Sequence, residues 1–147
     1  MAGRVWLGRA SKAAISAVEN AIMWILVPSF LSGALARYAP SSISLDLPMI
    51  FAFGAVITGL MALAALTNGL GVSVPFRTGA YLAEAFYIWT FLDAGVLNID
   101  VSGITITLSF ETLVFIMALP SLFNAVRAPL QYLMEESEAV KPITDAV

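Results

Sequence analysis

The stretch MIFAFGAVITGLMALAAL, residues Met49–Leu66, decides what kind of protein this chain is. No charged residue occurs between Asp46 and Arg77. A helix rises about 1.5 Å per residue, so about 18 or more apolar residues are enough to cross the roughly 30 Å hydrocarbon layer of a bilayer. The sequence therefore predicts a transmembrane helix here, and the remaining segments are placed relative to it.

The composition of the whole chain is also typical of a membrane protein. Its 147 residues are 60% hydrophobic and 12% charged, and the mean hydropathy is +0.91. A soluble domain of this length is usually about one-quarter charged, so these few charges are too sparse to coat a soluble globule. The length fits one domain, residues 1–147, and the first partner that we expect is the lipid bilayer.

Several function classes receive no support from the residues. The chain contains no cysteine and no histidine, which are the commonest thiolate ligand, general base and metal ligand. It also lacks the GxSxG, HExxH and glycine-rich phosphate-binding motifs. The net charge is −3 and the basic residues are scattered, which is unlike a nucleic-acid-binding surface. We therefore expect a non-enzymatic protein with no cofactor, no metal and no nucleic-acid partner.

Three other stretches are apolar enough to be spans. We expect Pro28 to kink the first span and Pro120 to kink the last. The second should end at Asn68-Gly69, because glycine favours the left-handed conformation found just past helix ends. Pro129 should begin a short terminal helix. We predict spans at about residues 13–38, 49–66, 79–97 and 108–126, followed by a tail of residues 127–147.

Two connecting segments alternate apolar with polar residues, which is typical of short strands. One is residues 42–47, and the other is residues 97–108, where Ser102-Gly103 is suited to a two-residue turn. A β-hairpin cannot lie exposed in lipid, so we expect these segments outside the membrane. The predicted fold is an all-α membrane protein, a four-helix transmembrane bundle with a small extramembrane β-hairpin/strand cap.

The basic residues divide unevenly between the two sides of such a bundle. Loops that stay in the cytoplasm are richer in Lys and Arg than loops that are exported. With four spans, only Arg37 lies on one side. We therefore predict a multi-pass integral membrane protein with both termini in the cytoplasm. The basic residues of the cytoplasmic side are Arg4, Arg9, Lys12, Arg77, Arg127 and Lys141.

Acidic residues in or beside the spans are the candidate site, because a carboxylate in a membrane is costly and often marks an ion pathway or an ion pair. If the third span begins at residue 79, Glu84 lies roughly 8 Å from its start, near the inner interface. We expect none of the acids at the midplane, and we expect pairing with Arg77 inside and with Arg37 outside. Two acids make the third span costly to insert, and the termini would separate if it did not cross fully. The acids are Glu19, Glu84, Asp93 and Glu111.

Two pairs of small residues at a spacing of four indicate close helix packing. Ser29 and Gly33 form one pair, and Ala55 and Gly59 form the other. In a membrane, small side chains let two helix backbones approach one another. The contact can lie within one bundle or between chains, and the sequence leaves both alternatives open.

These observations favour a non-catalytic, membrane-embedded structural or assembly subunit of a larger oligomer or lattice, such as a coat or envelope protein or a complex subunit. Its partners would be further copies of itself or other membrane subunits. The alternative is a small homo-oligomeric ion or proton channel or transporter that uses the acidic residues near the membrane interfaces.

Overall fold

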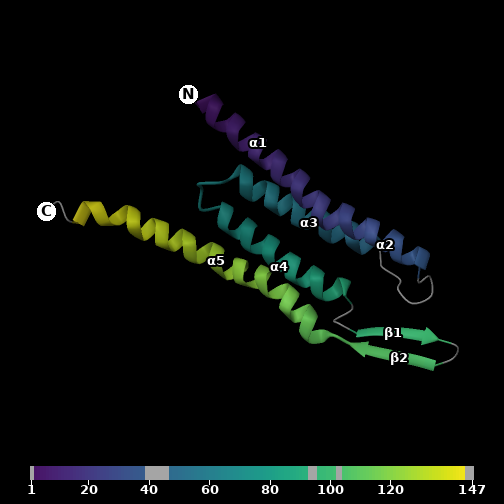
Figure 1. The fold of residues 1–147 in the computed structure, drawn as a ribbon. Helices are drawn as coiled ribbons and strands as arrows, with labels where there is room; N and C mark the ends of the chain where they lie inside the picture. Colours follow the sequence, from purple (N-terminus) through teal and green to yellow (C-terminus); the bar gives the residue numbers. More distant parts are fainter. Residues whose placement is uncertain (1, 39–46, 93–95, 102–103, 145–147) are drawn as a thin grey trace.

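The computed structural model describes residues 2–38, 47–92, 96–101 and 104–144, and this part of the chain is mostly helical. The first helical rod is continuous and consists of α1, a π-helical turn η1, and α2. Three further helices and a pair of strands follow (Figure 1). The elements are α1 (Ala2–Ala21), η1 (Ile22–Leu26), α2 (Val27–Tyr38), α3 (Leu47–Leu66), α4 (Ser73–Phe91), β1 (Val96–Val101), β2 (Ile104–Ser109) and α5 (Glu111–Thr144).

The rods pack in chain order and run in alternating directions (Figure 1). The first rod lies against α3, α3 lies against α4, and α4 lies against α5. Consequently α4 has a neighbour on each side, whereas α1 and α5 lie at the two edges. Both termini and the α3–α4 turn are at one end of the molecule, and the strands are at the other (Figure 1).

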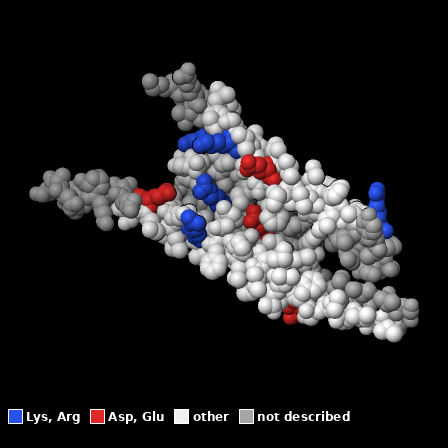
Figure 2. All heavy atoms as spheres, in the orientation of Figure 1, with Lys and Arg blue, Asp and Glu red and all other residues white. Residues whose placement is uncertain are grey.

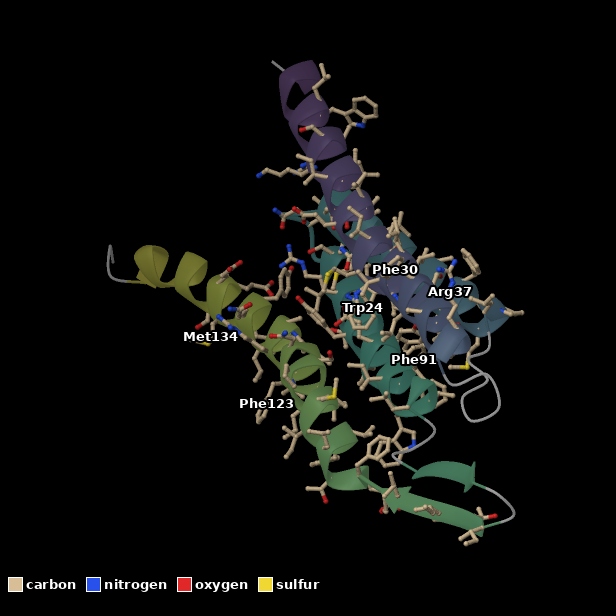
Figure 3. All side chains as sticks on the ribbon, turned by 45° about the vertical axis from the view of Figure 1, so that its right-hand side comes forward. Trp24, Phe30, Arg37, Phe91, Phe123 and Met134 are labelled. Atoms are coloured by element: carbon tan, nitrogen blue, oxygen red, sulfur yellow. The ribbon has the colours of Figure 1, made fainter. Side chains whose placement is uncertain are left out.

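The core is apolar and partly aromatic. Ile50 and Ile57 of α3 and Tyr87 of α4 are its most deeply buried members. Trp24 of η1 meets the Tyr87 ring edge-on, with the ring centroids 5.7 Å apart, a geometry that aromatic quadrupoles favour. The first rod therefore contacts α4 as well as α3. By contrast, Phe123 on α5 points away from the other helices (Figure 3), and it is exposed.

Three of the described helical segments are long and apolar enough to cross a membrane: Trp6–Ala34, Leu47–Leu66 and Glu111–Ser137. They correspond to the predicted first, second and fourth spans and are consistent with the predicted membrane protein. The second span ends as expected, because Gly69 adopts the left-handed conformation with φ of 81°. In contrast, the predicted helix start at Pro129 is wrong, since α5 continues unbroken through this residue.

The prediction for the third helix is wrong in its position. It runs from Ser73 to Phe91 and therefore begins and ends six residues earlier than the predicted span of residues 79–97. The prediction placed Pro75 in the turn before the helix, because proline is common in turns. In the first turn of a helix, however, backbone N–H groups make no hydrogen bond within the helix, so a proline there costs none. This helix, α4, is not among the three segments that qualify as spans by length and composition.

The irregularity expected at Pro28 takes the form of the π-helical turn. Proline has no N–H, so the carbonyl of Trp24 loses its normal α-helical donor four residues later. The chain widens locally, and the Val27 N–H donates to the carbonyl of Ile22, five residues back. A π turn of this kind absorbs the disruption without breaking the rod.

The strands β1 and β2 pair antiparallel, with Val96 opposite Ser109 and Val101 opposite Ile104. They lie at the end of the molecule that is farthest from the termini (Figure 1), which agrees with the expected position of the β segments. The predicted turn at residues 102–103 and most of the predicted strand at residues 42–47 lie outside the described residues. Leu47 itself is the first residue of α3.

Candidate functional site

Glu84 lies near the middle of α4, not near its end. The helix begins at Ser73 and has 19 residues, so the carboxyl group is about 16 Å along a rod of about 28 Å. The predicted position of about 8 Å from the start of its helix is therefore wrong, because Glu84 lies about twice as far along α4. The error follows directly from the misplaced start of the helix, because the six added residues move Glu84 about 9 Å farther along the helix.

The partner of Glu84 is a serine on the neighbouring helix. Ser121 Oγ of α5 donates to Glu84 Oε2 at 3.2 Å, and each residue is only 7% exposed. Ser121 is 37 residues away in the sequence and was not singled out there. The hydrogen bond joins α4 to α5 across a contact that also contains the buried alanines Ala118 and Ala125 of α5.

The expected partner of Glu84, Arg77, is engaged elsewhere. Arg77 Nη2 donates to Asn68 Oδ1 at 2.8 Å, at the turn between α3 and α4. On α5, Arg127 Nε and Nη2 donate to the side-chain oxygen of Gln131 at 2.9 and 3.1 Å when that amide is oriented to satisfy them. Within the described part of the chain, Glu84 thus has a hydroxyl as its partner and no cation.

The other candidate charges are dispersed. Glu19 on α1 is exposed, and Glu111 is exposed in the first turn of α5. Arg37 is exposed in the last turn of α2, and Asp93 lies outside the described residues. No ion pair joins the described members of the predicted set, and the described residues contain no group of three acids that could hold a metal ion.

Basic side chains gather at the end of the molecule that carries the termini and the α3–α4 turn (Figure 2). Arg9 Nη2 lies 3.7 Å from the position that a Cβ atom would take at Gly69 in this turn, and the Arg77–Asn68 hydrogen bond is made at the same turn. Arg37 ends α2, at the opposite end. The charge asymmetry expected from the sequence is therefore present in three dimensions.

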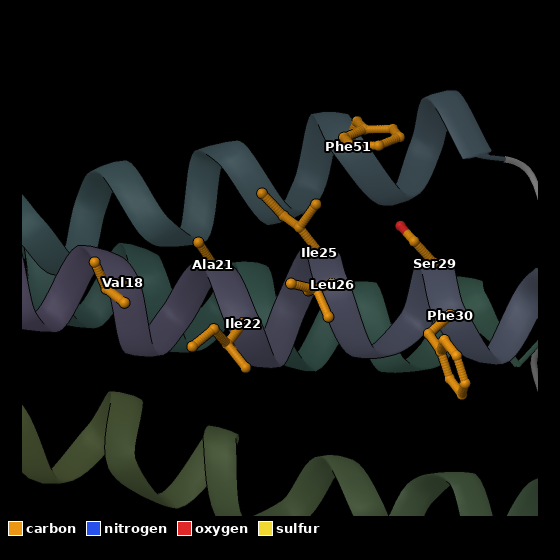
Figure 4. Close-up of a pocket in the computed structure, with 8 residues that line it drawn as sticks. All are labelled: Val18, Ala21, Ile22, Ile25, Leu26, Ser29, Phe30 and Phe51. Atoms are coloured by element: carbon orange, nitrogen blue, oxygen red, sulfur yellow. The ribbon is translucent and has the colours of Figure 1, made fainter.

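Three of the four members of the predicted small-residue pairs lie on open surfaces. Gly33, Ala55 and Gly59 are exposed, and a Cβ atom at Gly33 or Gly59 would meet nothing within 4 Å. Ser29 lines an apolar groove of about 630 Å³ beside the π turn (Figure 4). These pairs do not make the close contacts inside this chain. The groove is lined by Val18, Ala21, Ile22, Ile25, Leu26, Ser29, Phe30 and Phe51.

The close approach inside the chain uses Gly54, which the sequence analysis missed. A Cβ atom there would collide with the Ile25 side chain and lie 2.8 Å from the carbonyl oxygen of Trp24. That carbonyl is the one deprived of its donor by Pro28. A possible signal was the position of Gly54 between Ile50 and Ile57, at the spacing of a buried helix face.

Four hydroxyl groups are buried among the helices without a described partner. They belong to Ser29, Thr58, Thr78 and Tyr87. Most buried polar groups in proteins are hydrogen-bonded, so each unpaired hydroxyl is unfavourable. Ser121 differs from them because it has Glu84 as a partner.

No protein-family model, no curated protein and no solved structure matches this chain. The arguments about function therefore start from the geometry described above.

Proposed function

We propose that this chain is a non-catalytic integral membrane subunit that assembles through its helix faces into a larger oligomer or lattice. The observation that supports this most directly is the open surface at Gly33, Ala55 and Gly59. Helices in lipid associate through small residues because these residues allow close backbone contact. Open small-residue positions on α2 and α3 that the chain does not use internally are suited to contact with helices of another copy or of another membrane subunit.

The same proposal includes four spans with both termini in the cytoplasm. Helix α4 lies between α3 and α5 and runs antiparallel to both (Figure 1). Since α3 and α5 are each long enough to cross a membrane, a helix of about 28 Å between them would cross it too. The basic end of the molecule would face the cytoplasm, following the positive-inside rule.

A second candidate function is a small ion or proton channel or transporter. The observation that favours it is the position of Glu84 midway along α4, because transporters commonly bind their coupling ions near the membrane midplane. The sequence suggested a channel that uses acidic residues near the membrane interfaces. Among the described acids of the spans, Glu19 and Glu111 still fit that description, and both are exposed.

The assembly proposal is tested by the mass of the particle released from native membranes in mild detergent. We expect an oligomer for the wild-type chain and a shift toward the monomer for Gly59→Leu, because leucine would fill the space against a partner helix. Gly8→Leu is the matched control, since Gly8 also has nothing within 4 Å of its Cβ position but lies outside the two small-residue pairs. A wild-type monomer, or a Gly59→Leu variant that assembles normally, would contradict the proposal.

The two candidate functions differ in what Glu84→Gln should do in liposomes. A small closed ring of this chain alone would favour a channel, and the variant should then lose most of its ion or proton flux while its assembly is unchanged. A large, open or mixed-subunit particle without flux in either protein would favour the structural role.

The orientation can be measured directly because the chain contains no cysteine. Single reporters at Leu70→Cys, in the exposed α3–α4 turn, and at Thr105→Cys, in β2, lie at opposite ends of the molecule and outside the candidate spans. A maleimide that cannot cross membranes should label the Thr105→Cys protein in intact cells and the Leu70→Cys protein only after the membrane is opened. Labelling of both reporters from the same side would contradict the four-span topology.

A further inference from the structure

The Glu84–Ser121 contact has a chemical consequence that is separate from assembly. Glu84 is buried within a single chain, with only 7% of the residue exposed. Its described partner is one hydroxyl group at 3.2 Å. An isolated carboxylate in such surroundings carries a large desolvation cost, which is avoided if the group is neutral or has a cation beside it.

The ionisable groups around this contact do not supply that cation. Helix α3, which packs against α4, contains no ionisable residue. On α4, Arg77 is two turns away and donates to Asn68, and the other ionisable side chains, Tyr81 and Tyr87, are phenols that carry no positive charge. On α5, Glu111 lies ten residues before Ser121, and Arg127 lies six residues after it. Glu111 is an acid about 15 Å away along the helix, and the exposed Arg127 donates to the side-chain oxygen of Gln131 when that amide is oriented to accept.

A metal ion is a poor alternative occupant. Hard cations take about six or more oxygen ligands, whereas the described side-chain oxygens at this contact come from one carboxyl and one hydroxyl. The described residues also include no group of three acids suited to a metal. A proton needs no such ligand shell, and a protonated carboxyl can accept the Ser121 hydrogen bond while it stays uncharged.

We propose that Glu84 is a proton-binding site in the middle of the helix layer, with Ser121 holding the neutral carboxyl group across the α4–α5 contact. We expect this proton to exchange with solvent, because Glu84 is not completely buried and 7% of the residue remains exposed. The site does not depend on whether the chain assembles through Gly33, Ala55 and Gly59. Its test and the test of assembly can therefore fail separately.

Infrared difference spectroscopy in lipid bilayers at pH 7 tests the proposal. The C=O stretch of a protonated carboxylic acid is separated from the bands of a carboxylate. We expect the wild-type minus Glu84→Gln spectrum to contain this band and the band to shift in D2O. In Ser121→Ala the band should move to higher frequency, because the carbonyl group loses its hydrogen bond. A merely structural serine would leave the frequency unchanged.

The exposed acids provide the matched controls. The wild-type minus Glu19→Gln and wild-type minus Glu111→Gln difference spectra should contain carboxylate bands, because both residues are exposed. If the Glu84 difference also contains only carboxylate bands, the proposal is wrong. A protonated band that fails to shift in D2O would overturn the claim that the proton exchanges.

A chemical label gives an independent result. The apolar reagent dicyclohexylcarbodiimide adds a protonated carboxyl group across one C=N bond. The acid proton moves to nitrogen, the carboxyl oxygen bonds to the central carbon, and rearrangement gives an N-acylurea with no leaving group. We expect peptide mass spectrometry to find this label on Glu84 in the wild-type protein and its loss in Glu84→Gln. A water-soluble carbodiimide should label Glu111 and Glu135 instead. Labelling of those exposed acids by the apolar reagent, with none on Glu84, would overturn the proposal.

Discussion

The contact between η1 and α3 and the contact between α4 and α5 both lie away from the helix ends, and they are built from different chemistry. At the first, Gly54 lets its backbone approach the Trp24 carbonyl. At the second, Glu84 and Ser121 form a hydrogen bond between side chains. The first contact depends on the absence of a side chain, and the second depends on two specific polar groups. Lipid competes poorly with either one, because acyl chains have neither a flat backbone surface nor hydrogen-bonding groups.

Among substitutions at the two contacts, Gly54→Ala should lower the stability of the protein most. The added methyl group would overlap Ile25 and press on the Trp24 carbonyl, and overpacking of this kind typically costs about 1–3 kcal/mol of stability. Thermal unfolding in detergent, followed by tryptophan fluorescence, would report it. Gly59→Ala is the control and should change the unfolding temperature little, since its Cβ position is open. Equal effects of the two substitutions would mean that the η1–α3 contact is not tightly packed.

Ser121→Ala should have the next largest effect. It leaves the buried Glu84 carboxyl group without its partner, and a hydrogen bond between membrane helices contributes about 0.6–1.7 kcal/mol. Glu84→Gln preserves an acceptor for Ser121 and should cost less. A double-mutant cycle of Glu84→Ala with Ser121→Ala measures the coupling between the two side chains. Additive effects within error would show that the two residues do not interact in the membrane.

Tyr87→Phe should change the stability of the protein least, which separates an unpaired buried hydroxyl from the paired one of Ser121. The Tyr87 hydroxyl is buried without a described partner. The centroid of the Tyr87 ring lies 5.7 Å from that of Trp24 and 5.4 Å from that of Phe91. Removing an unpaired hydroxyl while keeping the ring should be neutral or stabilising by up to about 1 kcal/mol. The same unfolding assay applies. Clear destabilisation would reveal a hydrogen-bond partner for the hydroxyl in the membrane.

The two contacts also differ in how far the sequence predicted them. Glu84 was identified because an acid in an apolar segment is unusual in itself. Its partner was assigned to Arg77 by charge, although the structure shows Ser121, because complementary charge does not fix distance. Gly54 was missed while Gly33 and Gly59 were chosen, because a spacing of four says that two residues share a helix face and does not say what that face meets.

The sequence by itself indicated a membrane protein and predicted an apolar helix over residues 49–66 that ends before Gly69. These properties follow from local composition, length and glycine geometry, which act within a few residues. Only the tertiary structure decided the position of Glu84 along α4, its hydrogen bond to Ser121 and the burial of Gly54 beside Trp24. In a membrane chain the lipid-facing and core-facing sides of a helix are both apolar, so hydrophobic periodicity does not reveal which side is buried. Packing between distant segments sets that orientation.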